Sequence, residues 1–423
     1  DKSISHRSVM LGSIAEGRSE IEGFLVGEDS LATLAAFRAM GVRIERPSPG
    51  RVTVHGVGLR GLRAAGQPLD LGNSGTSMRL LAGLLAGQSF DSELIGDASL
   101  SRRPMARVAD PLRAMGACID TAELGRPPLR IHGGQSLRGI DYDMPVASAQ
   151  VKSSLLLAGL YAHGTTRVRE PAPTRDHTER MLAGFGYPLE RSGETVSLQG
   201  GGRLSGNALR VPADISSAAF FLVAASIAEG SDLLLTDVGI NPTRTGVLGI
   251  LGQMGAAIEI VATRESGGEP VADIRVRGAR LRGIEIPQEL VPLAIDEFPV
   301  LFVAAACAEG ETVLRGAEEL RVKESDRIEV MARGLRALGV ELETYPDGIR
   351  IRGAARLGAA RVDSCGDHRI AMAFCVASLR ARGEIEILDC DNVATSFPGF
   401  RELAASVGLQ VDAGMLPRAG DSP

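Results

Sequence analysis

The hydrophobic and polar positions along the chain repeat one order of elements six times. Each repeat opens with a segment that is apolar nearly all round and ends in glycine, a pattern typical of a buried helix. A strand-like stretch, a helix with charge on one face and a further strand follow. The apolar helices end at Gly17, Gly87, Gly164, Gly230, Gly310 and Gly383, and the charged ones at Gly41, Gly116, Gly186, Gly255, Gly339 and Gly408. A spacing of about 70 residues predicts six supersecondary units rather than a thin solenoid.

The length and the repeats together predict two domains of three units each. A chain of 423 residues exceeds what one hydrophobic core usually organises. The glycine-rich stretch at 199–207 falls near the midpoint and places the crossing near Pro212. We therefore expect an α/β (α+β) fold with domains at 1–211 and 212–423. Because the first residues already resemble a helix start, we also expect a short strand to precede Asp1.

Composition excludes several classes of partner. With 44% hydrophobic and 23% charged residues and short apolar runs, the chain has globular composition and no membrane segment. A net charge of -6 and the absence of tryptophan argue against a nucleic-acid surface. The cysteines are odd in number and lack C-x-x-C spacing, which favours reduced thiols and a cytoplasmic protein. They are Cys118, Cys307, Cys365, Cys375 and Cys390, and Cys118 is expected in the core.

Polar segments precede all six apolar helices. They contain the candidate N-caps Ser3, Ser74, Ser148, Ser216, Asp296 and Asp367. Free backbone N–H groups and the helix dipole make each start a potential anion site, and pseudo-threefold packing would direct three starts of each domain at one surface. Capping alone does not explain the cations in these helices, where the dipole disfavours positive charge. Those cations are Lys2, Arg7, Arg79, Lys152 and Arg369.

Further cations occur in short polar stretches, namely Arg102, Arg103, Arg175, Lys323 and Arg327. Solvated surface ion pairs would explain any one of them, but they explain the whole set poorly. Arginine forks suit carboxylate and phosphate, so the set predicts binding of a small, multiply charged anion. The GNSGTS segment matches no nucleotide-binding motif, and the histidines lack metal-ligand spacing. We expect no nucleotide, metal or other cofactor.

Two carboxylates are candidates for acid–base work in such a cleft. Asp296 opens a buried helix, and Glu324 lies between Lys323 and Arg327. Asp296 could instead be a helix cap, and Glu324 could form a surface ion pair with Arg327 at i+3. The residues alone leave both alternatives open.

Nine ordered motifs give the chain a family resemblance. KSISHR, GNSGTSMR, GDASLSRRPM, ASAQVKS, TRDHTERM, DEFP, RVKESDR, DHRIAMA and ATSFP occur in the order seen in 5-enolpyruvylshikimate-3-phosphate (EPSP) synthases, and the wording resembles the bacterial class II branch. The resemblance covers essentially the whole chain. It implies a two-lobed inside-out αβ barrel, each lobe built of three βαβαββ units with buried parallel helices and outer sheets. The missing N-terminal strand would belong to the C-terminal lobe, with Asp1 at the first crossover.

The reaction that this resemblance implies is transfer of the enolpyruvyl group of phosphoenolpyruvate to the 5-hydroxyl of shikimate 3-phosphate. It proceeds by addition to a tetrahedral intermediate and elimination of phosphate, and it serves the shikimate pathway. The implied shikimate 3-phosphate residues, on the N-terminal side, are Lys2, Ser3, Arg7, Ser148, Ala149, Gln150, Arg175, Asp296 and Lys323. The implied phosphoenolpyruvate residues are Lys2, Gly75, Arg103, Gln150, Arg327 and Arg369. The implied catalytic residues are Asp296 as base, Glu324 as acid, and Lys2 and Lys323.

The chain also departs from the family pattern. Ala149 stands where many relatives have a second serine, which removes one phosphate donor. Thr395 and Ser396 stand where other branches place a lysine, so neither receives a catalytic role. Gly75 is the small residue expected of members that the inhibitor glyphosate inhibits. The resemblance further implies a monomer.

Two other functions fit parts of this sequence pattern. A sister enzyme transfers enolpyruvyl to UDP-N-acetylglucosamine, but most of its members need a reactive loop cysteine, and Cys118 lies at a helix-to-strand junction. A non-catalytic scaffold could bind polyanions in the same groove. Substrate-dependent release of phosphate would separate these functions.

Overall fold

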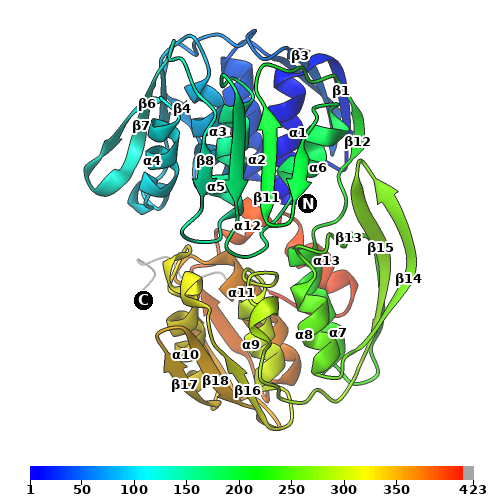
Figure 1. The fold of residues 1–423 in the computed structure, drawn as a ribbon. Coiled ribbons are helices and arrows are strands. Elements are labelled where there is room, and N and C mark those ends of the chain that lie inside the picture. Colours follow the sequence, from blue (N-terminus) through cyan, green and yellow to red (C-terminus); the bar gives the residue numbers. More distant parts are fainter. Residues whose placement is uncertain (413–423) are drawn as a thin grey trace, which may run out of the picture.

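The protein has two lobes, one above the other in Figure 1. The computed structural model describes residues 1–412, so 413–423 of the predicted second domain lie outside the described residues. One cluster of buried hydrophobic residues runs from Ile4 to Val211, and a second runs from Ile215 to Leu409. The two-lobed α/β fold predicted from the sequence is confirmed. No helix within residues 1–412 is long and apolar enough to cross a bilayer.

The six apolar segments form helices in the interior of the lobes. They are α1 (Lys2–Ile14), α3 (Gly75–Ala86), α5 (Ala149–Gly159), α7 (Ile215–Ile227), α9 (Phe298–Ala306) and α11 (His368–Ala377). Every residue of α9 is buried. Such helices are apolar all round because neighbouring elements cover them on all sides.

The charged helices and the strands lie outside this interior. The second helices of the six units are α2 (Glu28–Ala39), α4 (Ala106–Ala114), α6 (His177–Gly184), α8 (Gly246–Gln253), α10 (Arg327–Ala337) and α13 (Phe400–Ser406), and a single turn forms α12 (Val393–Ser396). The expectation of a charged face is wrong for α8, whose sequence GVLGILGQ has no charged residue. The N-terminal lobe has three sheets. The strand order of the first is β12 (Ala208–Arg210), β1 (Glu16–Glu22), β3 (Arg51–Val57), β2 (Arg43–Ser48), and that of the second is β4 (Leu69–Asp70), β5 (Ser92–Ile95), β7 (Arg126–His132), β6 (Cys118–Ala122). The strand order of the third is β10 (Glu190–Ser192), β11 (Thr195–Gln199), β9 (Thr165–Arg169), β8 (Asp141–Asp143). The C-terminal lobe has β13 (Asp232–Gly239), β15 (Glu269–Arg277), β14 (Ala257–Ser266); β16 (Glu311–Leu314), β18 (Gly348–Arg352), β17 (Glu341–Tyr345); and β19 (Ala360–Asp363) beside β20 (Ile385–Leu388). The predicted strand after each apolar helix is present as β1, β5, β9, β13, β16 and β20.

The chain passes from one lobe to the other beside its own N-terminus. Leu209 of β12 pairs in parallel with Ile21 of β1 in the N-terminal lobe. Four residues later, Ala213 forms a parallel bridge with Val238 of β13 in the C-terminal lobe. One extended segment therefore belongs to both lobes.

Three of the predicted helix caps are confirmed and three are wrong. The side chains of Ser74, Ser148 and Asp367 cap α3, α5 and α11. Asp1 caps α1 in place of Ser3, and Asp214 caps α7 in place of Ser216, because each helix begins two residues earlier than expected. Asp296 caps nothing, since α9 begins after Glu297, whose side chain makes no capping bond.

The prediction for Cys118 is also wrong. All five cysteines are free thiols, but Cys118 is exposed. It begins β6, where side chains alternate between solvent and core and Ile119 takes the buried position. The helix-to-strand junction therefore directs the thiol outward.

Helices α3 and α5 approach each other closely at a glycine. A Cβ added to Gly83 would overlap the backbone carbonyl of Ser154 on α5. Backbone atoms cannot move aside as a side chain can, so any side chain here must push the two helices apart.

We expect Gly83→Ala to lower the free energy of unfolding by about 1–3 kcal/mol, as overpacking usually does. The matched control is Gly252→Ala, because Gly252 is an exposed residue of α8 and a Cβ there meets nothing within 4 Å. The control should raise stability by about 0.5–1 kcal/mol. Urea unfolding of both variants tests this, and equal stabilities would contradict the close approach.

Candidate active site between the lobes

All six interior helices begin at one pocket of about 430 Å³ between the lobes. The helix starts contribute Ser3 of α1, Gly75 and Thr76 of α3, Ala149 and Gln150 of α5, Ser216 and Ser217 of α7, Asp296 just before α9, and His368 and Arg369 of α11. The predicted convergence of helix starts on one surface is therefore confirmed. Their dipoles and free N–H groups make the pocket a site for anions.

Charged side chains strengthen this preference. Ten arginines and lysines line the pocket against six aspartates and glutamates, although the chain as a whole carries a net charge of -6. The cations are Lys2, Arg79, Arg102, Arg103, Arg107, Arg175, Arg244, Lys323, Arg327 and Arg369. An acidic protein that concentrates cations in one cleft is suited to a small polyanion.

Arg327 binds three carboxylates of the C-terminal lobe at the pocket. Its side chain is 1% exposed, and its three nitrogens each donate to a different carboxylate. Nε lies 2.8 Å from Asp367 Oδ2, Nη1 3.1 Å from Asp296 Oδ1, and Nη2 2.7 Å from Glu324 Oε2. Burial alone would lower the pKa of Arg327, but the three carboxylates outweigh burial and raise it.

Asp296 is surrounded by cations from both lobes. Arg175 of the N-terminal lobe donates to its Oδ2, and Lys323 Nζ lies 3.5 Å from its Oδ1. Arg369 Nη1 donates to its backbone oxygen at 2.9 Å. Burial would raise the pKa of this carboxyl, but Lys323, Arg175 and the neighbouring arginines hold it well below its usual value. The neighbouring cations therefore favour the ionised form of Asp296.

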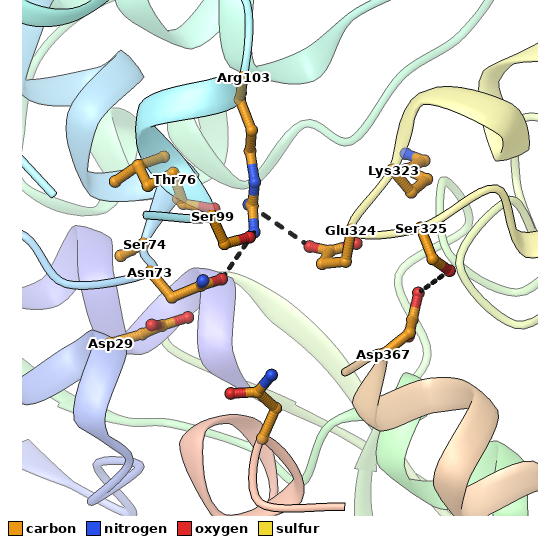
Figure 2. A network of polar contacts seen from close by, with 12 residues as sticks. Asp29, Asn73, Ser74, Thr76, Ser99, Arg103, Lys323, Glu324, Ser325 and Asp367 are labelled. Atoms are coloured by element: carbon orange, nitrogen blue, oxygen red, sulfur yellow. Dashed lines mark hydrogen bonds and ion pairs between the residues drawn. The ribbon is translucent and has the colours of Figure 1, made fainter. Parts of the chain in front are cut away.

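Glu324 forms the second contact across the cleft (Figure 2). Its Oε1 lies 3.6 Å from Nη1 of Arg103, which also donates through Nη2 to Asn73 Oδ1 at 2.6 Å. Burial opposes ionisation of Glu324, but Arg327 and Arg103 lower its pKa. Glu324 does form the i,i+3 pair with Arg327, yet this pair lies in the pocket and not on a solvated helix surface.

The N-terminal half of the pocket presents amides, hydroxyls and a paired lysine. Gln150 accepts from Arg79 Nη1 at 2.6 Å and donates to Thr76 Oγ1 at 3.1 Å. Lys2 forms an ion pair with Asp29 of α2. Thr395 and Ser396 of α12 also line the pocket.

Of the fourteen candidate site residues, Arg7 alone does not line the pocket. It is buried behind Ser3, where Nε donates to Thr178 Oγ1 at 2.6 Å and Nη1 to the Ser3 carbonyl at 3.0 Å. Burial lowers the pKa of Arg7 to about 10.

The expectation that Lys152 binds an anionic ligand is wrong. Its side chain is fully buried and faces Glu170 and Glu179. Lys152 follows the pocket-lining Gln150 by two residues on α5, about 200° round the helix, so it points away from the pocket.

Sequence reasoning missed several pocket residues. Arg244 donates to Ser216 Oγ at 2.6 Å and to Asp214 Oδ1 at 3.1 Å. His368, buried at the start of α11, has its pKa lowered to about 4, chiefly by burial. His368 belongs to DHRIAMA, one of the motifs that carry the family resemblance, so that motif could have identified it. No motif of the chain includes Arg244.

Fold and pocket together define a two-lobed α/β enzyme whose substrates are small polyanions. Residues 1–403 match the family model described as EPSP synthase (3-phosphoshikimate 1-carboxyvinyltransferase), and the chain belongs to this family. It is 69% identical over 427 residues to the 3-phosphoshikimate 1-carboxyvinyltransferase of Alkalilimnicola ehrlichii, covering 100% of this chain and 96% of the relative. The corresponding protein of Methylococcus capsulatus is 69% identical over 412 residues, 97% of this chain and 94% of that one.

Solved structures agree with this assignment. The EPSP synthase of Acinetobacter baumannii superposes with a TM-score of 0.88 at 59% identity, covering 97% of this chain and 94% of that one. The enolpyruvyl transferase NikO of Streptomyces tendae has a TM-score of 0.75 at 17% identity, covering 96% of this chain and 93% of that one. The second likeness shows the shared fold.

We expect Arg327→Met to lower the free energy of unfolding by about 3–5 kcal/mol, because it leaves buried carboxylates without their partner. The control, Arg350→Met, removes an exposed pair with Glu343 and should change stability by less than about 1 kcal/mol. Urea unfolding at neutral pH measures both. Similar losses in the two variants would show that Arg327 has no special role in the C-terminal lobe.

Proposed function

We propose that this pocket carries out the EPSP synthase reaction through the residue roles given below. The chain transfers the enolpyruvyl group of phosphoenolpyruvate to the 5-hydroxyl of shikimate 3-phosphate and releases phosphate. Each substrate carries a phosphate and a carboxylate. The observation that carries the proposal is the convergence of six helix starts and ten cations on one pocket.

The two lobes divide the ligands between them. Residues 1–211 form the shikimate 3-phosphate side, with Ser148, Gln150 and Arg175 at the ring and 3-phosphate and Ser3 at the carboxylate end. Arg7 supports Ser3 from behind through its carbonyl. Ala149 adds a backbone N–H but no hydroxyl at the start of α5.

Residues 212–423 form most of the phosphoenolpyruvate side. Arg327 and Arg369 of this lobe and Arg103 from the opposite lobe form the clamp, with the Gly75 backbone beside it. Lys2 and Lys323 lie where the two ligands meet and stabilise developing charge. Arginine forks suit both the phosphate and the carboxylate of this substrate.

Asp296 and Glu324 divide the proton transfers. Glu324 protonates the methylene carbon, which makes the neighbouring carbon cationic, and the 5-hydroxyl attacks that carbon while its proton passes to Asp296. In the second half, the methyl carbon returns its proton as the phosphate leaves. The pocket supplies position and a preorganised field.

Substrate binding readies both acids for these steps. The ligands' phosphates and carboxylates compete for Arg103, Arg175 and Arg327, which now pair with the two acids. As these cations turn to the ligands, burial raises the pKa of Glu324, so it can hold a proton. Asp296 gains basicity in the same way.

The rival functions find less support. Cys118 is exposed on β6 and is not among the pocket-lining residues, so it does not match the reactive cysteine of the UDP-N-acetylglucosamine enzyme. A non-catalytic scaffold would not require Asp296 or Glu324. Because one chain supplies both halves of the pocket, we also propose that the enzyme acts as a monomer, and that its free thiols suit the cytoplasm.

We expect Asp296→Asn and Glu324→Gln each to lower kcat by about 10² to 10⁴-fold, the usual contribution of a positioned acid or base. The measurement is phosphate release in the presence of both substrates. Glu318→Gln, on an exposed residue just before the pocket-lining Glu319, serves as the control and should keep the parental rate. Folded acid variants that turn over at the parental rate would falsify the assignment.

We expect glyphosate to inhibit the parent, and Gly75→Ala to weaken that inhibition by about tenfold or more, the value of one misplaced methyl group. An added Cβ would lie 3.0 Å from Arg79 Nη1 and 3.3 Å from Arg103 Nη1, so the phosphoenolpyruvate side must give way. Shikimate 3-phosphate binding should change by less than about threefold, since the two side chains nearest the methyl, Arg79 and Arg103, are not among the proposed contacts of that substrate. Inhibitor and substrate titrations of both proteins test this, and equal inhibition would refute it.

A further inference from the structure

A buried cluster of Lys152, Glu170 and Glu179 contacts the segment that carries Arg175. Lys152 of α5 is 0% exposed, and its Nζ lies 2.5 Å from Glu170 Oε1 and 2.6 Å from Glu179 Oε1. Glu170 is 2% exposed and directly follows β9. Placing an ammonium group and two carboxyl groups in the interior is costly, so the cluster requires a reason beyond packing.

The second oxygen of Glu170 closes the loop that leads to the pocket. Glu170 Oε2 accepts from the backbone N–H of Thr174 at 2.7 Å and from its Oγ1, also at 2.7 Å. Both oxygens of the carboxylate are therefore in use, one toward α5 and one across the turn at 171–173. Thr174 itself lines the pocket.

The residue after Thr174 is Arg175, which reaches across the cleft to Asp296. Arg175 belongs to an irregular segment between β9 and α6, so no helix or strand fixes the backbone of this residue. The contacts of Lys152 and Glu170 tie this segment to α5, whose first turn carries Gln150. Helix α5 thus positions Gln150 directly and Arg175 through Glu170 and Thr174.

We propose that Lys152 and Glu170 are positioning residues that hold Arg175 for the 3-phosphate of shikimate 3-phosphate. They touch no substrate and act through the Thr174 turn. This rests on the proposed role of Arg175 as a ligand of that substrate. A small displacement of a guanidinium that must meet a phosphate bidentately weakens binding strongly.

We call the contacts of Glu170 with Lys152 and with Thr174 the brace. The variants Glu170→Gln and Thr174→Val test it with little change in side-chain volume. A glutamine offers one acceptor oxygen where Glu170 offers two, so it can serve either Lys152 or Thr174 but not both. We expect Glu170→Gln to raise KM for shikimate 3-phosphate on the order of tenfold and to leave KM for phosphoenolpyruvate within about twofold. Thr174→Val loses one of the two bonds to Glu170 and should raise the same KM by a smaller factor. A merely structural role would move both KM values together.

The matched control is Arg169→Gln, one residue before Glu170, whose exposed side chain pairs with Asp143. It should leave both KM values unchanged. Circular dichroism and thermal midpoints confirm that each variant is folded. If Glu170→Gln is unfolded, Thr174→Val, which keeps the buried ion pair, decides the question.

A double-mutant cycle with Arg175→Gln separates the brace from the role of Arg175. If the brace acts through Arg175, Glu170→Gln adds little to KM for shikimate 3-phosphate once Arg175 is glutamine. If Arg175→Gln raises that KM but Glu170→Gln and Thr174→Val do not, the brace is refuted while the Arg175 contact stands. An unchanged KM in Arg175→Gln itself overturns the proposed contact, and additive effects in the cycle place the action of Glu170 elsewhere.

Discussion

The buried guanidinium of Arg327 is the interaction on which the C-terminal half of the site depends. It is bonded to Asp296, Glu324 and Asp367, which come from three separate segments of the chain. A buried guanidinium requires anions around it, and buried carboxylates likewise require cations. Each group therefore offsets the free-energy cost of burying the others. The same bonds place both acids and the start of α11 at fixed positions around one cation. Stability and placement therefore have one cause.

Charged side chains of the cleft pair with each other across the lobes. Arg175 meets Asp296, and Arg103 faces Glu324, each pair joining one lobe to the other. A substrate with a phosphate and a carboxylate can take over these arginines without leaving a buried cation unpaired. The carboxyl group that it displaces would then be buried without a paired cation, which raises the pKa of that carboxyl group. In the proposed reaction, substrate binding and the rise in the pKa of an acid or base would therefore be one exchange of partners, among the ten cations and six acids that line the pocket.

The sequence predicted the architecture better than the side-chain contacts. The apolar segments identified all six interior helices, because complete burial leaves a pattern with no polar face. Their predicted ends were wrong, since each helix stops before its glycine and Gly17 already belongs to β1. The predicted caps at Ser3 and Ser216 were each wrong by two residues, since Asp1 and Asp214 take the cap position. Lys152 and Arg79 stand alike in early turns of helices, yet only Arg79 faces the pocket. Which way each points depends on helical phase against partners far away in sequence, such as Glu170 and Gln150.

The crossing between the lobes is continuous with the site rather than a loose linker. Arg244, 3% exposed, donates to Ser216, and Ser216 donates to Glu297 beside Asp296. Glu297 Oε1 lies 3.7 Å from Nη1 of Arg369, the same nitrogen that donates to the Asp296 carbonyl. On the other side, Arg244 Nη1 is 3.2 Å from Asp1 Oδ2, at the cap of α1 in the N-terminal lobe. A change in the angle between the lobes must therefore alter polar contacts that extend from the crossover to Arg369, a residue of the proposed phosphoenolpyruvate clamp.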